Sequence, residues 1–151
     1  MSKVLALDLG TTTGWASFNT EYPKLMVSGT WKLKPRREES SGMRYIKFIN
    51  SLNQFKNQAD IVVFEDVKRH LGTYAAHIYG GLLSHLQVWC VTNDVQFTGI
   101  PVGTIKKFAT GKGNAGKPLM VKAACKLSGR DITSDDEADA ICLLNYYIKE
   151  L

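Results

Sequence analysis

Apolar residues along this chain follow two patterns, short runs with strand-like spacing and longer stretches with helical spacing. The continuous runs at residues 4–8 and 61–65 each end in a carboxylate and predict buried strands. The run at 61–65 is typical of a central parallel strand. Alternating residues at 14–18 and 26–31 predict two more strands, which continue the first as an antiparallel meander. A fifth strand is predicted at residues 95–100.

The remaining apolar positions recur every three or four residues, as in amphipathic helices. They predict helices over residues 41–57, 73–91, 102–109, 118–127 and 135 to the end. Ser134 with Glu137 three residues later is a capping-box pattern that predicts the start of the last helix. Strands first, followed by alternating helices and strands, predict one α/β domain over residues 1–151, with a mixed five-stranded sheet flanked by helices.

The charge of the chain favours a phosphate-rich partner. It carries 19 Lys and Arg against 14 Asp and Glu, a formal net charge of +5. Lys and Arg displace the counterions of nucleic acid, although many basic soluble proteins bind none. The three cysteines lack the spacing of a zinc site or a disulfide framework. No apolar run approaches the length of a membrane span, so we expect a cytoplasmic protein without membrane contact.

Four carboxylates stand where a metal site could form. Asp8 and Glu65 end two predicted strands, and the carboxyl ends of parallel strands meet at one edge of a sheet. Asp136 and Asp139 are three residues apart on one face of the last helix. Hard oxygen donors without a neighbouring His or Cys favour Mg²⁺ or Mn²⁺ over zinc. Two such ions about 4 Å apart could activate water and stabilise the leaving oxygen of a phosphodiester.

A simpler interpretation covers only part of this acidic group. Acidic residues at 135–137 would complement the dipole of the last helix at its N-terminus, without any metal. This does not explain Asp139, which lies inside the apolar stretch of residues 138–144. A charged carboxylate in such a place is costly unless something compensates it.

Three short motifs resemble those of one family. Residues 7–16, Leu-Asp-Leu-Gly-Thr-Thr-Thr-Gly-Trp-Ala, resemble the opening strand of the RuvC-type Holliday-junction resolvases. Residues 63–67 are similar to the second motif of that family, and residues 136–140 to its closing Asp-x-x-Asp-Ala helix. The resemblance implies an RNase H-like fold. It also implies a Mg²⁺-dependent, structure-specific endonuclease that cuts Holliday junctions and other branched DNA by two-metal-ion hydrolysis.

The resemblance also implies roles for individual residues. Metal binding would belong to Asp8, Glu65, Asp136 and Asp139, where the three-residue step favours Asp136 over its neighbour Asp135. Lys117 would join them at the scissile phosphate. The expected DNA-binding residues are Lys68, Arg69, His70, Lys106, Lys107, Lys112 and Lys117. The family acts as a homodimer through the helix corresponding to residues 73–91, whose small residues at 75, 76, 80 and 81 suit close packing.

One departure from the family concerns specificity. Some cellular relatives carry an aromatic residue three positions after the motif glutamate, where this chain has Lys68. A phage-type enzyme with broader preference for branched DNA, acting in a bacterial or phage-infected cell, fits that change. The alternatives are another RNase H-like nuclease, cutting RNA in hybrids or flaps, and a junction-binding protein without catalysis.

Two other motifs point to nucleotides but fit less well. Residues 111–117 match a Walker A loop, yet Pro118 replaces its Ser or Thr, and the loop follows a predicted helix rather than a strand. Residues 8–12 also resemble the phosphate loop of actin-like sugar kinases, whose two lobes need more than twice this chain. His70, His77 and His85 have no Cys or acidic partner nearby and are not expected to bind metal. The three tryptophans are expected in the core.

Overall fold

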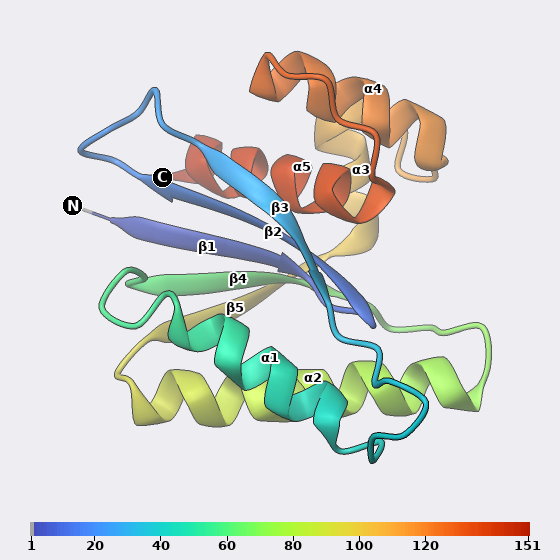
Figure 1. Ribbon diagram of the computed structural model, residues 1–151. Coiled ribbons are helices and arrows are strands. Elements are labelled where there is room, and N and C mark those ends of the chain that lie inside the picture. Colours follow the sequence, from blue (N-terminus) through green and yellow to red (C-terminus); the bar gives the residue numbers. More distant parts are fainter. Residues whose placement is uncertain (1) are drawn as a thin grey trace.

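A mixed five-stranded sheet forms the middle layer of the molecule (Figure 1), in a computed structural model that describes residues 2–151. The strands are β1 (Lys3–Asp8), β2 (Thr12–Asn19), β3 (Val27–Lys32), β4 (Ile61–Asp66) and β5 (Gln96–Pro101). Their order is β3-β2-β1-β4-β5. The first three strands pair antiparallel, whereas β1, β4 and β5 pair parallel. The predicted meander is confirmed, and β1 and β4 are neighbours in the sheet.

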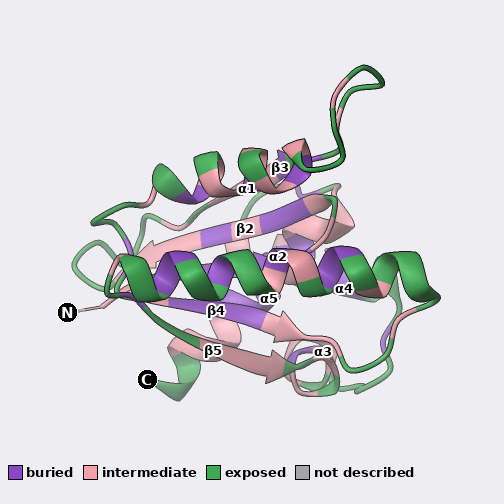
Figure 2. Cartoon of the chain, turned by 90° about the horizontal axis from the view of Figure 1, so that it is seen from below, coloured by how far each residue is buried: buried purple, intermediate pink, exposed green. Residues whose placement is uncertain are grey.

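Helices cover both faces of this sheet, as Figure 1 shows. They are α1 (Met43–Asn53), α2 (Thr73–Thr92), α3 (Val102–Thr110), α4 (Lys117–Ser128) and α5 (Asp135–Glu150). Helices α1 and α2 lie on one face, and α3, α4 and α5 on the other. The α2 helix is buried on its inner side and exposed along its outer side (Figure 2).

The alternation of side chains along β1 decides which core each residue joins. Leu5 and Leu7 pack toward α1 and α2, whereas Val4 and Ala6 pack toward α5. Because successive side chains of a strand point to opposite faces, Asp8 follows Val4 and Ala6 to the α5 side. The same rule places Glu65 on the side of Val63. Both strand-end acids therefore face the N-terminal part of α5.

The predicted helix at residues 41–57 is shorter in the structure and ends at Asn53. The chain then forms turns, in which Asn57 adopts a left-handed conformation with φ of 64°. Asparagine tolerates that conformation better than most residues. Phe55 keeps its apolar role outside the helix, since its ring packs 5.5 Å from that of Trp15 and 6.1 Å from that of Trp31. Trp31 and Trp89 are buried as expected, and Trp15 is half-buried.

The N-terminus of α5 follows the capping prediction only in part. The Glu137 backbone N–H donates to Ser134 Oγ at 3.2 Å, which confirms Ser134 as the cap. The Glu137 carboxylate, however, accepts from Ser28 Oγ at 2.7 Å rather than completing a capping box. Ser28 also accepts from Arg130. These contacts tie the first turn of α5 to β3, which fixes the position of the acids that the turn carries.

Candidate active site

Three of the four predicted acids meet at the carboxyl edge of the sheet. Carboxylate oxygens of Asp8, Glu65 and Asp139 lie within 4.8 Å of one another, and each side chain is half-buried. Asp136 lies beside them, close enough to hydrogen-bond with Asp8. Asp135 points instead to Lys117, whose Nζ is 3.1 Å from its carboxylate. Asp136 therefore adjoins Asp8, whereas Asp135 pairs with Lys117.

A glycine allows α5 to approach the sheet at this point. Gly14 on β2 stands directly opposite Asp8 in the strand register. A Cβ atom at Gly14 would overlap the backbone carbonyl of Asp136. Only glycine therefore leaves room for the first turn of α5 to lie on β2, next to Asp8. No local pattern in the sequence indicates this function of Gly14, because the motif alone predicts only a loop followed by a strand.

The acids repel one another in this arrangement, as their pKa values show. Burial raises the pKa of Asp8 well above its usual value, with further increases from the charge of Glu65, a hydrogen bond to Glu65 and the charges of Asp139 and Asp136. Burial, followed by the charges of Glu65, Asp135 and Asp136, raises the pKa of Asp139 to about 7. Burial and the charge of Asp135 also raise the pKa of Asp136.

This donor set fits a divalent cation. It offers several carboxylate oxygens at short range, no sulfur or imidazole ligand from residues 2–151, and an excess of negative charge that a bound cation would relieve. Asp8, Glu65 and Asp139 could bind one ion together, with Asp136 at its side. Such a group, drawn from two strands and a helix, cannot be explained by the dipole of α5 alone.

The pKa of Asp139 predicts how stability depends on pH without metal. The folded protein holds a proton on Asp139 up to about pH 7, whereas the unfolded chain releases it near 3.8. The folded state thus binds more protons between these values, and its stability falls as the pH rises through them. We expect a higher melting temperature near pH 5 than near pH 8 in EDTA, and a smaller difference for Asp139→Asn. A wild-type melting temperature that is equal or higher near pH 8 would contradict this.

Solved structures share this arrangement of elements. Thermus thermophilus RuvC matches at a TM-score of 0.75 and 17% identity, over 98% of this chain and 96% of its own. The same protein in complex with Holliday junction substrate matches at 0.77 and 16%, over 99% and 96%. The yeast mitochondrial Holliday junction resolvase Ydc2 matches at 0.64 and 16%, over 98% and 78%. No protein-family model matches the sequence, and no curated protein matches it significantly.

The chain has the RuvC fold. The likeness runs over almost the whole length of this chain and of T. thermophilus RuvC. It confirms the predicted RNase H-like architecture and the family resemblance at the level of the fold. Within the RuvC fold of this chain, β1, β4 and α5 are the elements that bring the acids together.

A tyrosine fixes the end of β4 in this RuvC fold. Tyr79 on α2 donates a hydrogen bond from Oη to the Glu65 carbonyl at 2.8 Å and accepts one from the Val67 N–H at 3.1 Å. Its ring is buried, and burial is the main cause that raises its pKa. Tyr79 thereby holds the backbone on both sides of Asp66 and orients Glu65. No local pattern in the sequence indicates this role, since an apolar helix position normally packs in the core.

The two lysines singled out by sequence lie at different places around the acids. Lys117, at the start of α4, is exposed and forms its ion pair with Asp135. Lys106, on α3, is half-buried and lies close to Asp139. Its positive charge lowers the pKa of the Asp139 carboxyl, whereas the surrounding acids raise it. Lys107 and Lys112 are exposed at the end of α3 and in the loop after it. Both Lys106 and Lys117 therefore border the acidic group from the α3–α4 side.

The segment after β4 is basic at its surface and aromatic underneath. Lys68 is exposed and pairs with Asp66 at 2.9 Å, and Arg69 is exposed. His70 is half-buried, with its ring 4.8 Å from that of Tyr79. Lys68 and Arg69 thus lie at the surface, whereas His70 packs beside Tyr79.

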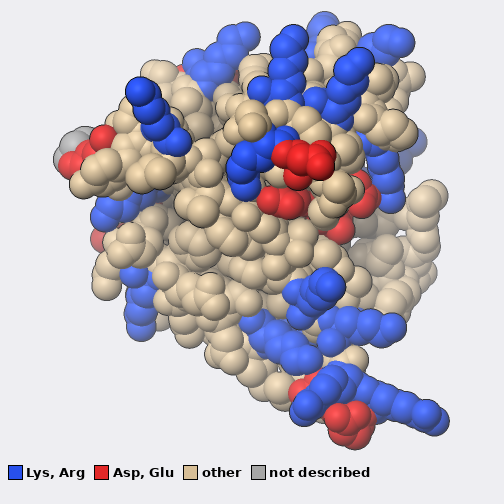
Figure 3. Space-filling view, turned by 45° about the horizontal axis from the view of Figure 1, so that its top comes forward, with Lys and Arg blue, Asp and Glu red and all other residues tan. Residues whose placement is uncertain are grey.

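A further basic surface is not apparent from the sequence alone. It follows β3 and consists of Lys32, Lys34, Arg36 and Arg37, all exposed. The Leu33 N–H donates to the carbonyl of Thr11, three residues after Asp8, so this segment starts at the edge that carries the acids. Figure 3 shows lysine and arginine side chains on both sides of a compact acidic group. In the sequence these residues form only a charged segment between a predicted strand and a predicted helix, which does not indicate that they lie near the acids.

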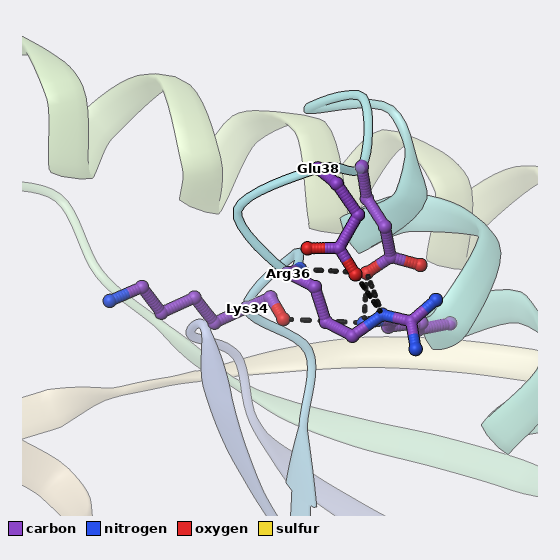
Figure 4. A network of polar contacts seen from close by, with 5 residues as sticks. Lys34, Arg36 and Glu38 are labelled. Carbon is purple, nitrogen blue, oxygen red and sulfur yellow. Dashed lines mark hydrogen bonds and ion pairs between the residues drawn. The ribbon is translucent and has the colours of Figure 1, made fainter.

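Ion pairs give this loop a defined shape (Figure 4). Glu39 accepts from Lys47 Nζ at 2.8 Å and from the Arg36 N–H at 2.7 Å, and these two bonds are the main causes that lower its pKa to about 2. Arg36 Nε lies 3.3 Å from Glu38, and Lys47 also donates to the Lys34 carbonyl. The loop between β3 and α1 is thus folded on itself by short-range contacts.

The remaining motifs behave as expected. The loop at residues 111–117 follows α3, not a strand, which argues against a nucleotide-binding P-loop. His85 stacks on Tyr45 at 4.8 Å, and His77 is exposed. Cys90 and Cys142 are buried free thiols whose pKa burial raises to about 12. Within residues 2–151, no helix has both the length and the apolar character needed to cross a membrane.

Proposed function

We propose that this chain is a Mg²⁺-dependent endonuclease that cuts four-way junctions and other branched DNA. The observation that carries the proposal is the meeting of Asp8, Glu65 and Asp139 at the carboxyl edge of a RuvC fold. Structures with this fold include a RuvC in complex with Holliday junction substrate and a mitochondrial Holliday junction resolvase. The basic side chains on both sides of an acidic group (Figure 3) could bind the phosphate backbone of a DNA strand that crosses the acids.

The acids would act as ligands and positioning groups. Two Mg²⁺ ions, which Mn²⁺ could replace, would supply an activated water and stabilise the leaving oxygen. Asp8 contacts both Glu65 and Asp136, so it would hold the centre of the site. Glu65 on β4 and Asp139 on α5 would provide the other ligands of the site. Tyr79 keeps the Glu65 backbone in place while the substrate binds.

We propose separate roles for the two lysines beside this site. Lys117 would act at the scissile phosphate, and Lys106 on the neighbouring backbone. We expect Lys117→Met to lower the single-turnover rate at least about tenfold more than it lowers affinity, because charge develops at that phosphate. Lys106→Met should weaken binding to every DNA shape and reduce the salt slope by about one unit.

Affinity is measured in Ca²⁺ across a salt series, and cleavage in Mg²⁺ at saturating protein. A wild-type cleavage rate for Lys117→Met would assign that lysine to backbone binding only. Lys106 lies close enough to Asp139 to be the lysine that acts at the scissile phosphate instead. If Lys106→Met alone lowers the rate, the two roles are exchanged.

We further propose that the protein works as a homodimer through α2. The small residues of α2 do not all share an outer face: Gly81 packs against Tyr45 within the chain. Gly80 is different, since no atom lies within 4 Å of the place of its Cβ, and Val88 and Val91 are exposed on the same helix (Figure 2). Their surface suits an isologous contact that gives two active sites per assembly.

We expect light scattering to show a dimer at micromolar concentration and Val88→Glu to shift it toward monomer. The matched control is Lys122→Glu on α4, which introduces the same acid on another exposed helix position. A wild-type monomer, both alone and with junction DNA, would contradict the proposed dimer.

A panel of substrates tests the proposed activity. We expect Mg²⁺-dependent cutting of synthetic four-way and three-way junctions, and little cutting of a linear duplex of the same sequence. Preference for an RNA/DNA hybrid or a flap would instead indicate another nuclease activity on the same fold. Tight binding without cutting, in both Mg²⁺ and Mn²⁺, would indicate a non-catalytic junction-binding protein.

A further inference from the structure

We propose that Ser28 and Arg130, which lie outside the acidic group, are positioning residues of the metal site. They form a chain of hydrogen bonds, from Arg130 through Ser28 to the Glu137 carboxylate on α5, which we call the serine bridge. The bridge sets how α5 is turned toward Asp8 and thereby how tightly the acids bind a divalent cation. This inference rests on the proposed metal-dependent function and assigns residues that control the metal affinity of its site.

Each bond of the serine bridge has a defined direction. The Glu137 carboxylate only accepts, so the Ser28 hydroxyl donates its single proton to it, and the two oxygens lie 2.7 Å apart. The lone pairs that remain on the Ser28 oxygen accept from the Arg130 guanidinium. Both bonds have one charged partner, and such bonds are stronger than those between neutral groups. The bridge therefore holds Glu137 more firmly than a lone hydroxyl would.

The serine bridge acts on the same helical turn that carries two of the acids. Glu137 directly follows Asp136 and comes two residues before Asp139. Successive residues of an α-helix point about 100° apart, so Glu137 projects to a different side of α5 from the two aspartates. Its contact with β3 fixes the rotation of α5 about its own axis. That rotation directs Asp136 and Asp139 toward Asp8.

Two neighbouring strands provide the contacts that this orientation needs. Ser28 stands opposite Ala16 in the strand register, and Ala16 belongs to the core on the α5 side. Residues directly opposite each other in a sheet share a face, so the Ser28 side chain also points toward α5. Gly14, two residues before Ala16 on β2, allows the close approach of α5. Gly14 thus sets the distance of α5 from the sheet, whereas the serine bridge sets its rotation.

The connection between α4 and α5 holds Arg130 within reach of Ser28. Gly129 ends α4 in a left-handed conformation with φ of 69°, and its N–H donates to the Cys125 carbonyl at 2.9 Å. The Ile132 N–H donates to Cys125 Sγ at 3.3 Å. Arg130 itself is exposed, so its replacement removes the bond to Ser28 without disturbing the core.

Loss of the serine bridge should weaken binding of Mn²⁺, measured by electron paramagnetic resonance on the protein without DNA. We expect Ser28→Ala to raise the dissociation constant about tenfold, as for other residues that orient a metal ligand. Arg130→Met removes only the outer bond and should raise it about threefold. Ser28→Thr keeps the hydroxyl and should restore binding. The matched control Ser51→Ala removes another half-buried hydroxyl, bonded to the Lys47 carbonyl within α1, and should bind like the wild type.

A double-mutant cycle separates this role from a general loss of stability. Glu137→Ala removes the acceptor of the bridge, so adding Ser28→Ala to it should change Mn²⁺ affinity no further. A further loss of about tenfold in that background would overturn the inference, as would wild-type affinity of Ser28→Ala. Thermal melts in EDTA show whether each variant folds. If Ser28→Ala does not fold, wild-type Mn²⁺ affinity of Arg130→Met overturns the inference instead.

Cleavage of a four-way junction reports separately on the proposed nuclease. We expect Ser28→Ala to need about tenfold more Mg²⁺ for half-maximal cutting and to reach the wild-type rate at saturating Mg²⁺, since bound cations draw the acids together. A lower rate at saturation with an unchanged Mg²⁺ requirement would overturn the inference. Mn²⁺ binding with the expected pattern, but no cutting by the wild type, would support the serine bridge and contradict the proposed nuclease.

Discussion

Removing one carboxylate of the acidic site should abolish cutting but not binding. We expect Asp8→Asn, Glu65→Gln or Asp139→Asn to lower the single-turnover rate on a four-way junction by more than about a hundredfold. Loss of a residue that merely supports a metal ligand already costs about 10- to 100-fold, and a direct ligand should cost more. Affinity for the junction in Ca²⁺ should stay within about threefold of wild type, since DNA is held mainly by basic side chains.

The matched control is Asp94→Asn, the same chemical change at an exposed position beyond the end of α2. Asp94 has a left-handed backbone with φ of 56°, which asparagine also accepts, so the control should fold and cut normally. A variant of Asp8, Glu65 or Asp139 that keeps near-normal turnover in Mg²⁺ does not belong to the site. These variants should melt no lower than the wild type in EDTA, because each removes part of the mutual repulsion.

A methyl group on Gly14 should damage both stability and activity. Gly14→Ala places its Cβ inside the space of the Asp136 carbonyl, so the first turn of α5 must move away from β2. Overpacking of this kind costs about 1–3 kcal/mol of unfolding free energy. The same movement separates Asp136 and Asp139 from Asp8, so we expect cleavage to fall by at least about a hundredfold. Urea unfolding and single-turnover cleavage measure the two effects.

Gly103→Ala is the control for this experiment. Gly103 is exposed on α3, and a Cβ there would meet only the Gly113 carbonyl at 3.7 Å, an ordinary contact. The change should leave stability equal or slightly higher, since alanine favours helix over glycine. If Gly14→Ala is as stable and active as Gly103→Ala, the close approach of α5 to β2 does not set the geometry of the acids.

The features that could be predicted from sequence are those encoded locally. Strand periodicity places Asp8 and Glu65 at strand ends, and parallel pairing then brings them to one edge. A three-residue helical step puts Asp136 and Asp139 on one face. The acidic site could therefore be predicted, together with the order of its elements. Its resemblance to a known family added the roles of the residues, which spacing alone could not supply.

The supporting residues could not be predicted, because their contacts are long-range. Tyr79 bonds to the backbone around Glu65, 14 residues away. Arg44 looks like one polar interruption in an amphipathic helix, and only the fold shows that it is buried beside Thr11 and Tyr74. Gly14 has meaning only once α5 lies on β2. In each case the partner lies on another element, and its distance along the chain says nothing about the contact.

The central claim is that Asp8, Glu65 and Asp139 together bind a divalent cation. Crystals grown near pH 8, above the pKa of about 7 for Asp139, can be soaked in Mn²⁺ and measured for anomalous scattering. We expect a strong peak between the three carboxylates, with ligand oxygens roughly 2.0–2.3 Å away, and no such peak in Asp8→Asn crystals. An empty acidic site in wild-type crystals, with Mn²⁺ bound elsewhere, would contradict the claim.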